Sequence, residues 1–121
     1  MSAKKTILAV DDDPKQLELL GAKLAQENYR LIVTQSGEEA LKTIKMEKPD
    51  LVLLDILMPN MDGLATLKQI KKLDPDIAVV MVTSVYDNEE GKKCFEAGAS
   101  EYVTKPVDFE HLKNVIFTKL L

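Results

Sequence analysis

Chemically reactive side chains follow four separate apolar runs of this sequence. Asp11 and Asp12 follow the first run, Asp55 the third, Thr83 the fourth and Lys105 the fifth. If these runs are parallel strands, their carboxyl ends meet at one edge of a sheet, where open α/β sheets bind ligands. We therefore expect three carboxylates, a hydroxyl and an ammonium to lie together, although they are far apart in the chain.

Carboxylates gathered at one point need a compensating charge. Two of them about 4 Å apart repel by about 4 kcal/mol at an effective dielectric near 20, so some hold protons or a cation lies among them. An all-oxygen set suits Mg²⁺ or Mn²⁺, often together with phosphate oxygens. A carboxylate such as Asp55 can also act as a nucleophile and take a phosphoryl group. The metal, Lys105, and either Thr83 or a backbone N–H would then neutralise the three phosphoryl oxygens.

The rest of the chain predicts the elements that position these residues. Five apolar runs alternate with five helical patterns, which indicates βαβ units and a parallel sheet, hence a doubly wound α/β fold. The predicted strands are 6–10, 30–34, 51–54, 77–82 and 102–103. The wholly apolar runs 51–54 and 77–82 are typical of central strands that are covered on both faces.

Helix starts are marked by capping residues. Asp13 is a good N-cap, Pro14 suits the first helical position, and Gln16 falls where the partner of a capping box would be. A second capping box, Ser36 to Glu39, opens the next helix. The last helix follows Asp108 and is expected to run to residue 121, so that residues 1–121 form one domain.

Composition excludes several classes of function. The formal net charge is −4 and the lysines are scattered in the sequence, which argues against a nucleic-acid-binding face. No apolar run approaches the roughly 20 residues that span a membrane, and the first residues do not have the pattern of a signal peptide. We therefore expect a cytoplasmic protein with no membrane partner. Cys94 and His111 lie in different segments, so a thiol–imidazole pair is not indicated, and Cys94 is expected to be a buried apolar residue.

The sequence resembles the receiver domain of two-component response regulators over essentially its whole length. The segments that carry the resemblance are 7–14 (ILAVDDDP), 55–63 (DILMPNMDG), Thr83-Ser84 and Lys105-Pro106. The resemblance implies a flavodoxin-like (βα)5 fold with strand order 2-1-3-4-5. It also implies a phosphoacceptor switch that catalyses only its own phosphotransfer and dephosphorylation, and not an enzyme.

The resemblance further implies a role for each site residue. Asp55 would take the phosphoryl group from a phosphohistidine of a sensor histidine kinase or phosphotransfer protein. Mg²⁺, or Mn²⁺, would be held by Asp11, Asp12, Asp55 and the backbone carbonyl of Leu57. Lys105 would bind a phosphoryl oxygen, and its peptide bond to the following proline would be cis.

Two further residues would transmit the signal, again by resemblance. Thr83 would move toward the new phosphate, and Tyr102 would turn inward into the space that Thr83 leaves. The readout surface would comprise the fourth helix, fifth strand and fifth helix, through which a homodimer is also possible. Leu57 comes two residues after Asp55 and Val85 two residues after Thr83, and both are apolar. We hypothesise that they exclude the hydrolytic water, so that the phosphorylated state is long-lived.

Three alternatives stay open at this point. Asp11 and Asp13 also resemble the nucleophile motif of haloacid-dehalogenase phosphatases, although Pro14 stands where that family favours a small residue, the chain is short for it, and segment 55–63 is left unexplained. A binding module that has lost phosphorylation would lack an acid, the threonine or the lysine, and none is missing. The segment 60–63 resembles part of an EF-hand, but the other ligands of a calcium loop are absent at the required spacing.

Overall fold

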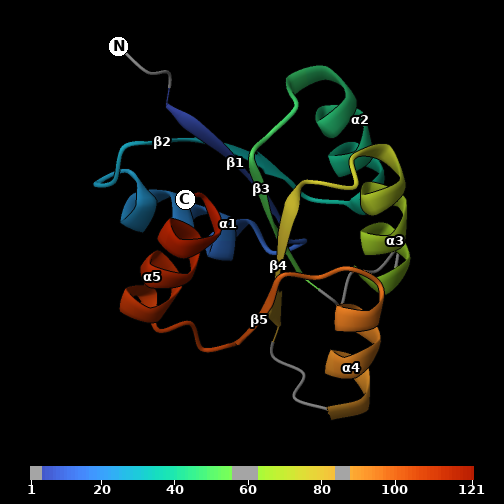
Figure 1. Cartoon of the computed structure of the whole chain (residues 1–121). Helices are drawn as coiled ribbons and strands as arrows, with labels where there is room; N and C mark the ends of the chain where they lie inside the picture. Colours follow the sequence, from blue (N-terminus) through green and yellow to red (C-terminus); the bar gives the residue numbers. More distant parts are fainter. Residues whose placement is uncertain (1–3, 56–62, 84–87) are drawn as a thin grey trace.

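A five-stranded parallel sheet with helices on both faces forms the protein (Figure 1). The computed structural model describes residues 4–55, 63–83 and 88–121. Its strands are β1 (Lys5–Val10), β2 (Tyr29–Thr34), β3 (Leu51–Leu54), β4 (Ala78–Thr83) and β5 (Glu101–Thr104). Its helices are α1 (Pro14–Leu24), α2 (Gly37–Glu47), α3 (Gly63–Leu73), α4 (Asn88–Glu96) and α5 (Phe109–Lys119).

The strand order is β2-β1-β3-β4-β5, which confirms the predicted order 2-1-3-4-5. All neighbouring strands pair in parallel. The register pairs Val10 with Leu54, Leu54 with Met81, and Thr83 with Thr104. The carboxyl ends of β1, β3, β4 and β5 therefore lie along one edge of the sheet.

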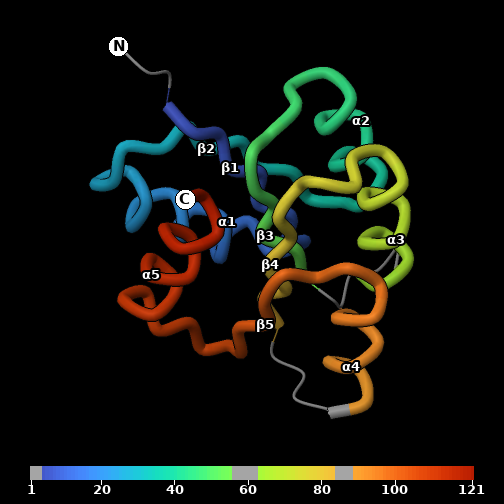
Figure 2. The backbone as a smooth tube through the Cα atoms, in the orientation of Figure 1, coloured from blue at the N-terminus to red at the C-terminus, as the bar shows by residue number. Residues whose placement is uncertain are grey.

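Each face of the sheet has its own hydrophobic core. Figure 2 shows α2, α3 and α4 on one face of the sheet and α1 and α5 on the other. The first group of helices contributes Ile44, Leu67 and Cys94 to one core, and the second contributes Leu17 and Ile116 to the other. Strand β3 supplies both cores because successive side chains of a strand point to opposite faces. All four of its residues are buried, which confirms that it is covered on both faces. Cys94 is fully buried, as predicted.

The start of α1 differs from the sequence prediction in one respect. Asp13 is the N-cap, and its carboxylate accepts the backbone N–H of Lys15. The predicted capping box is wrong, because the backbone N–H of Asp13 donates to Asp11 Oδ1 at 3.0 Å. That donor is therefore already satisfied, and the side chain of Gln16 is left to point elsewhere.

The other helix ends follow the sequence closely. Ser36 Oγ accepts the backbone N–H of Glu39 at 3.1 Å, as half of the predicted box. The Glu39 carboxylate accepts the N–H of Gln35 instead of that of Ser36, at 3.4 Å. Helix α5 ends at Lys119 and not at residue 121, because the backbone of Leu120 leaves the helical region at φ −98° and ψ 3°. No helix in the described part of the chain is long and apolar enough to cross a bilayer.

Candidate functional site

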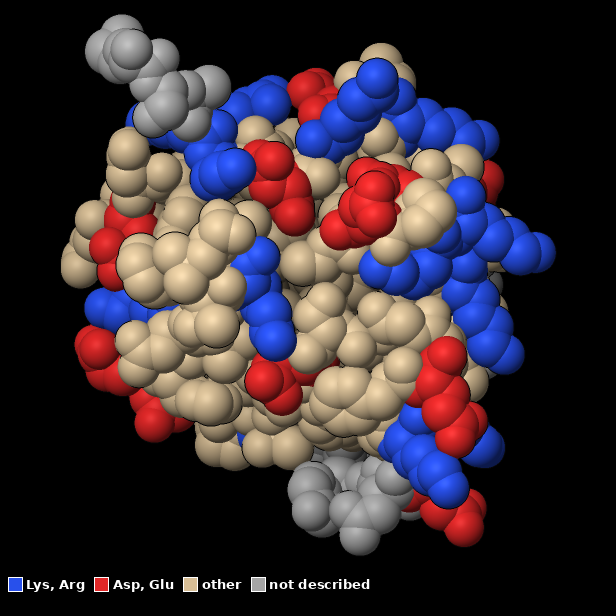
Figure 3. Space-filling model, viewed as in Figure 1, with Lys and Arg blue, Asp and Glu red and all other residues tan. Residues whose placement is uncertain are grey.

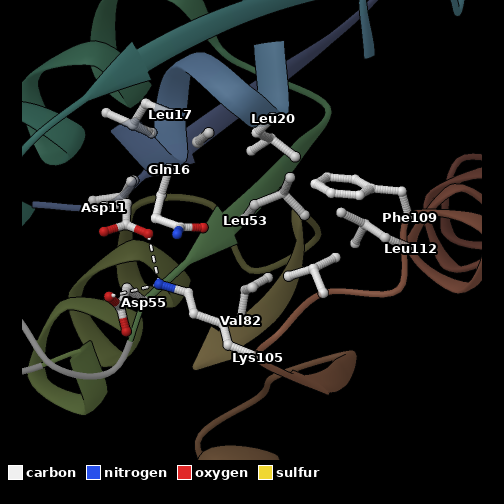
Figure 4. Close-up of a pocket in the computed structure, with 13 residues that line it drawn as sticks. Asp11, Gln16, Leu17, Leu20, Leu53, Asp55, Val82, Lys105, Phe109 and Leu112 are labelled. Atoms are coloured by element: carbon white, nitrogen blue, oxygen red, sulfur yellow. Dashed lines mark hydrogen bonds and ion pairs between the residues drawn. The ribbon is translucent and has the colours of Figure 1, made fainter. Parts of the chain in front are cut away.

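Three charged side chains meet at the carboxyl edge of the sheet (Figure 4). Lys105 Nζ lies 2.8 Å from Asp11 Oδ2 and 3.4 Å from Asp55 Oδ2. Asp11 and Asp55 are 8% and 7% exposed. Charges this well shielded from water are normally paired, and the Lys105 ammonium pairs with both acids at once. The structure therefore brings together residues that are 94 and 50 positions apart.

The backbone fixes each of these residues one step beyond its strand. The N–H of Asp55 donates to the carbonyl of Val10 at 3.0 Å, so the β1–β3 ladder continues past β3. The N–H of Asp11 donates to Thr34 at 3.2 Å, and that of Lys105 donates to Thr83 at 2.7 Å. Because each residue extends a sheet ladder, its position is as rigid as the sheet itself. The site is thus built on the scaffold, whose geometry is more precise than that of free loops.

Asp12 completes an acidic cluster. Ligand atoms of Asp11, Asp12 and Asp55 all lie within 4.8 Å of one another, and Asp12 is the exposed member. Opposite ligands of an octahedral Mg²⁺ are about 4.2 Å apart, so small side-chain rotations bring these oxygens to a shared ion. Together with Lys105, the three carboxylates carry two uncompensated negative charges. Hard oxygen donors with this excess charge fit Mg²⁺ or Mn²⁺.

Lys105 is a permanent cation in this setting. Partial burial lowers the pKa of its ammonium, whereas the hydrogen bond to Asp11 and the charge of Asp55 raise it. The raising effects together are larger, so the pKa of Lys105 lies above its ordinary value. The ammonium therefore stays charged throughout the neutral range. It can stabilise negative charge on a ligand, but it is not suited to accept a proton. The bond from Lys105 to Pro106 is cis, as predicted.

Thr83 ends β4, and Tyr102 lies on β5, the strand that leads to Lys105. Thr83 is the last residue of β4 and is fully buried. Tyr102 lies on β5 opposite Met81 and is partly buried against the core beneath α4. A Cβ placed on Gly91 of α4 would lie 3.8 Å from the Tyr102 ring, so a larger side chain at this position would touch the ring. Leu57, Ser84, Val85 and the turn 60–62 are outside the described residues.

A narrow crevice opens between α1 and α5 next to the cluster. Its volume is about 30 Å³, and apolar residues form most of its wall. Asp11, Asp55, Lys105 and Gln16 make up its polar end (Figure 4). Sequence reasoning assigned Gln16 only to a helix cap. A signal was present nevertheless, since Gln16 precedes Leu20 by one helical turn and so lies on the same side of α1, with its own side chain exposed.

Asp13 has a structural role that weakens the phosphatase alternative. Its carboxylate caps α1 and its side chain is exposed, whereas that alternative needs Asp11 and Asp13 to act as a pair. Asp11 is instead paired with Lys105. The acid at the centre of the sheet edge is therefore Asp55, on the central strand.

Several lysines that are scattered in the sequence lie close together over α2 and α3 in the folded molecule. Helix α3 carries Lys68, Lys71 and Lys72 and no acidic residue, and Figure 3 shows basic side chains concentrated over α2 and α3. Lys71 has a structural contact, because its ammonium donates to the carbonyl of Ile77 at 2.8 Å. Among the described lysines, Lys105 alone forms an ion pair with the acidic cluster.

A parallel five-stranded sheet with acids and a lysine at its carboxyl edge defines a doubly wound α/β ligand-binding domain. Comparison with known proteins gives the family. The response regulator receiver domain matches residues 7–117. The chain belongs to this family.

Full-length relatives are transcriptional regulators. The chain is 39% identical over 113 residues to the transcriptional regulatory protein ZraR of Salmonella typhimurium, covering 93% of this chain and 26% of that protein. It is 36% identical over 110 residues to GlrR of Escherichia coli K12, covering 91% of this chain and 25% of that protein. The chain thus spans about a quarter of the length of these curated relatives.

Solved structures show the same fold. A CheY-like receiver domain protein from Methanospirillum hungatei superposes with a TM-score of 0.94 at 35% identity, covering 98% of this chain and 94% of that one. NtrX from Brucella abortus, a longer protein, superposes with a TM-score of 0.90 at 31% identity. That match covers 98% of this chain and 27% of the NtrX chain.

Proposed function

We propose that this receiver domain accepts a phosphoryl group on Asp55 from a phosphohistidine of a sensor histidine kinase or phosphotransfer protein. The observation that carries the proposal is the position of Lys105 Nζ, 3.4 Å from a buried Asp55 that shares a cluster with Asp11 and Asp12. A nucleophilic carboxylate, a fixed cation and an excess of acidic ligands are the groups that phosphoryl transfer to an aspartate requires.

The chain's own residues have distinct tasks in this reaction. An oxygen of Asp55 attacks phosphorus, the bond from phosphorus to the donor imidazole nitrogen breaks, and the imidazole leaves with the electron pair. The ammonium of Lys105 then cancels charge on one phosphoryl oxygen. Mg²⁺ bound by Asp11, Asp12, Asp55 and the backbone carbonyl of Leu57 would supply charge neutralisation on another oxygen. Thr83 is positioned at the end of β4 to supply a hydroxyl.

Phosphorylation would act as a switch because it adds charge and strong hydrogen-bond acceptors at one point. A loop state in which Thr83 bonds the phosphate gains population. We expect the change to reach the surface of α4, β5 and α5 through Tyr102, and from there an output domain or partner in the cytoplasm. Apolar Leu57 and Val85 would keep the phosphorylated state long-lived.

Mass spectrometry of the intact chain tests the chemistry. The parent, incubated with acetyl phosphate and Mg²⁺, should gain the mass of one phosphoryl group. Asp55→Asn should gain none, because the amide cannot form the acyl phosphate. Chelation of the metal should abolish the gain in the parent.

Asp76→Asn is the matched control, since Asp76 is an exposed aspartate in the turn before β4. It should be phosphorylated like the parent. A phosphoryl adduct on Asp55→Asn at the parental level, or an adduct that forms equally well after chelation, would contradict the proposal.

A further inference from the structure

The amide of Gln16 points toward the acidic cluster and has no hydrogen-bond partner among the residues that the structure describes. Figure 4 shows this side chain reaching from α1 toward the space between Asp11 and Lys105. No hydrogen bond to the Gln16 side chain is formed by the described residues. Its expected capping partner, the N–H of Asp13, is bound by Asp11 instead. Gln16 is exposed, so its amide can offer both its donor and its acceptor to water.

The crevice beside Gln16 has the size and the polarity to hold water. A water molecule needs about 10–15 Å³ of such volume and two to four polar partners. The crevice offers about 30 Å³, which is room for about two waters. Its polar end presents Gln16, Asp11, Asp55 and Lys105, while its apolar walls between α1 and α5 offer no competing hydrogen bonds. Water held there would be ordered by the polar end alone.

We propose that Gln16 is a positioning residue, whose amide orients the water that hydrolyses the phosphoryl group on Asp55. This inference rests on the proposed function. The water oxygen attacks phosphorus, the bond from phosphorus to the Asp55 oxygen breaks, and the carboxylate is regenerated. The proton of the attacking water passes to a phosphoryl oxygen, and inorganic phosphate leaves. Gln16 accepts a hydrogen bond from this water through its carbonyl oxygen and so fixes its direction.

Gln16 would give the hydrolysis step a polar side chain that comes from α1. The side chains two positions after Asp55 and Thr83, which are Leu57 and Val85, are apolar and cannot hydrogen-bond water. Residual hydrolysis then depends on α1. The rate at which the signal decays is set by the helix beside the acidic pair, separately from the residues that take up the phosphoryl group.

The lifetime of the phosphorylated chain tests the inference. Parent, Gln16→Met and Gln16→Asn are phosphorylated with acetyl phosphate and Mg²⁺, the donor is removed, and loss of the adduct is followed by mass spectrometry. Methionine has the length of glutamine and favours helix, but it lacks the amide. Gln16→Met should lose phosphate about fivefold to tenfold more slowly, the effect expected for one hydrogen bond in the transition state. Gln16→Asn, with an amide one methylene shorter, should lie between.

Two controls separate positioning from a general effect on structure. Gln69→Met changes an exposed glutamine of α3 and should leave the lifetime unchanged. Hydroxylamine attacks the carbonyl carbon of an acyl phosphate and bypasses the water, so its cleavage rate should be equal in the parent and Gln16→Met.

Several outcomes would overturn the inference. A lifetime of Gln16→Met within twofold of the parent would do so, as would equal slowing of the hydroxylamine reaction. Failure of Gln16→Met to be phosphorylated, with the parent phosphorylated, would show that Gln16 acts on phosphoryl uptake and not on hydrolysis. Absence of an adduct on the parent itself would instead refute the proposed function.

Discussion

Replacing Lys105 by methionine should destabilise the metal-free protein and strengthen its binding of Mg²⁺. The ammonium lies 2.8 Å from Asp11 and 3.4 Å from Asp55. At an effective dielectric near 20 these contacts correspond to gross attractions of about 6 and 5 kcal/mol. Most of this is offset by desolvation of the charges, because the Lys105 side chain is only 18% exposed. We expect a net loss of about 2 kcal/mol, since two buried acids lose the charge of the lysine.

The same change should favour a divalent cation. In the variant the acids have lost their ammonium counter-ion, and the repulsion between Lys105 and a bound Mg²⁺ is gone. Removing a repulsion of about 1.4 kcal/mol tightens binding about tenfold, which is the size we expect at this partly shielded site. Mg²⁺ should therefore stabilise the variant more than the parent and recover much of the lost stability.

Thermal unfolding with and without Mg²⁺ measures both effects. Without the metal, the midpoint of Lys105→Met should fall by roughly 6–10 °C, given about 2 kcal/mol in a domain of this size. Lys113→Met is the control, because Lys113 also contacts two acids, Glu27 and Glu110, but at the surface. Its midpoint should change little, and its response to Mg²⁺ should match that of the parent. Equal stabilisation of the parent and Lys105→Met by Mg²⁺ would refute the reasoning.

Three further predictions concern stability. Burial and the charge of Glu27 raise the pKa of Tyr29, so the folded state holds this proton more tightly and stability is lost as pH rises through and above about 10. In urea unfolding between pH 8 and 10.5, Tyr29→Phe should therefore lose less stability than the parent, and an equal loss would contradict this. Gly98 has φ +107° and its added Cβ would lie 3.0 Å from Lys71 Cε, so Gly98→Ala should cost about 1–3 kcal/mol in urea unfolding. Leu67 is fully buried, and Leu67→Ala should cost about 2–5 kcal/mol in the same assay, with a loss below 1 kcal/mol arguing against a packed core.

The sheet was predictable because its signal is local. Wholly apolar runs such as 51–54 and 77–82 suit only strands covered on both faces, and the observed β3 and β4 match them to within one residue. Strand order came from the family resemblance, since apolar runs do not say which strand lies beside which. The gathering of Asp11, Asp55 and Lys105 followed from placing each after a strand, and the structure shows the three in contact.

The details that escaped prediction depend on competition between distant groups. Gln16 does not cap α1 as expected, because the N–H of Asp13 donates to Asp11 instead. Asp11 in turn is oriented by its contact with Lys105, which lies near the other end of the chain. The lysines of α3 form a concentrated surface together with those of α2 because the two helices are neighbours on one face of the sheet. Neither arrangement can be deduced from spacing within a single segment.

The contacts around Thr83 indicate how a signal would leave the site under the proposed function. The carbonyl of Thr83 is held by the N–H of Lys105, so its backbone is tied to the same residue that pairs with Asp55. The response of Thr83 is therefore a rotation of its side chain, which is fully buried. Such a rotation would open space on the face that Thr83 shares with Met81, and close-packed interiors do not keep such a space empty.

Among the described residues, an aromatic side chain on the next strand packs against the same core as Met81. Tyr102 pairs with Met81 across β4 and β5, and its ring lies near α4, 3.8 Å from where a Cβ on Gly91 would be. Any inward turn of Tyr102 must therefore withdraw its ring from α4 and change the packing of that helix.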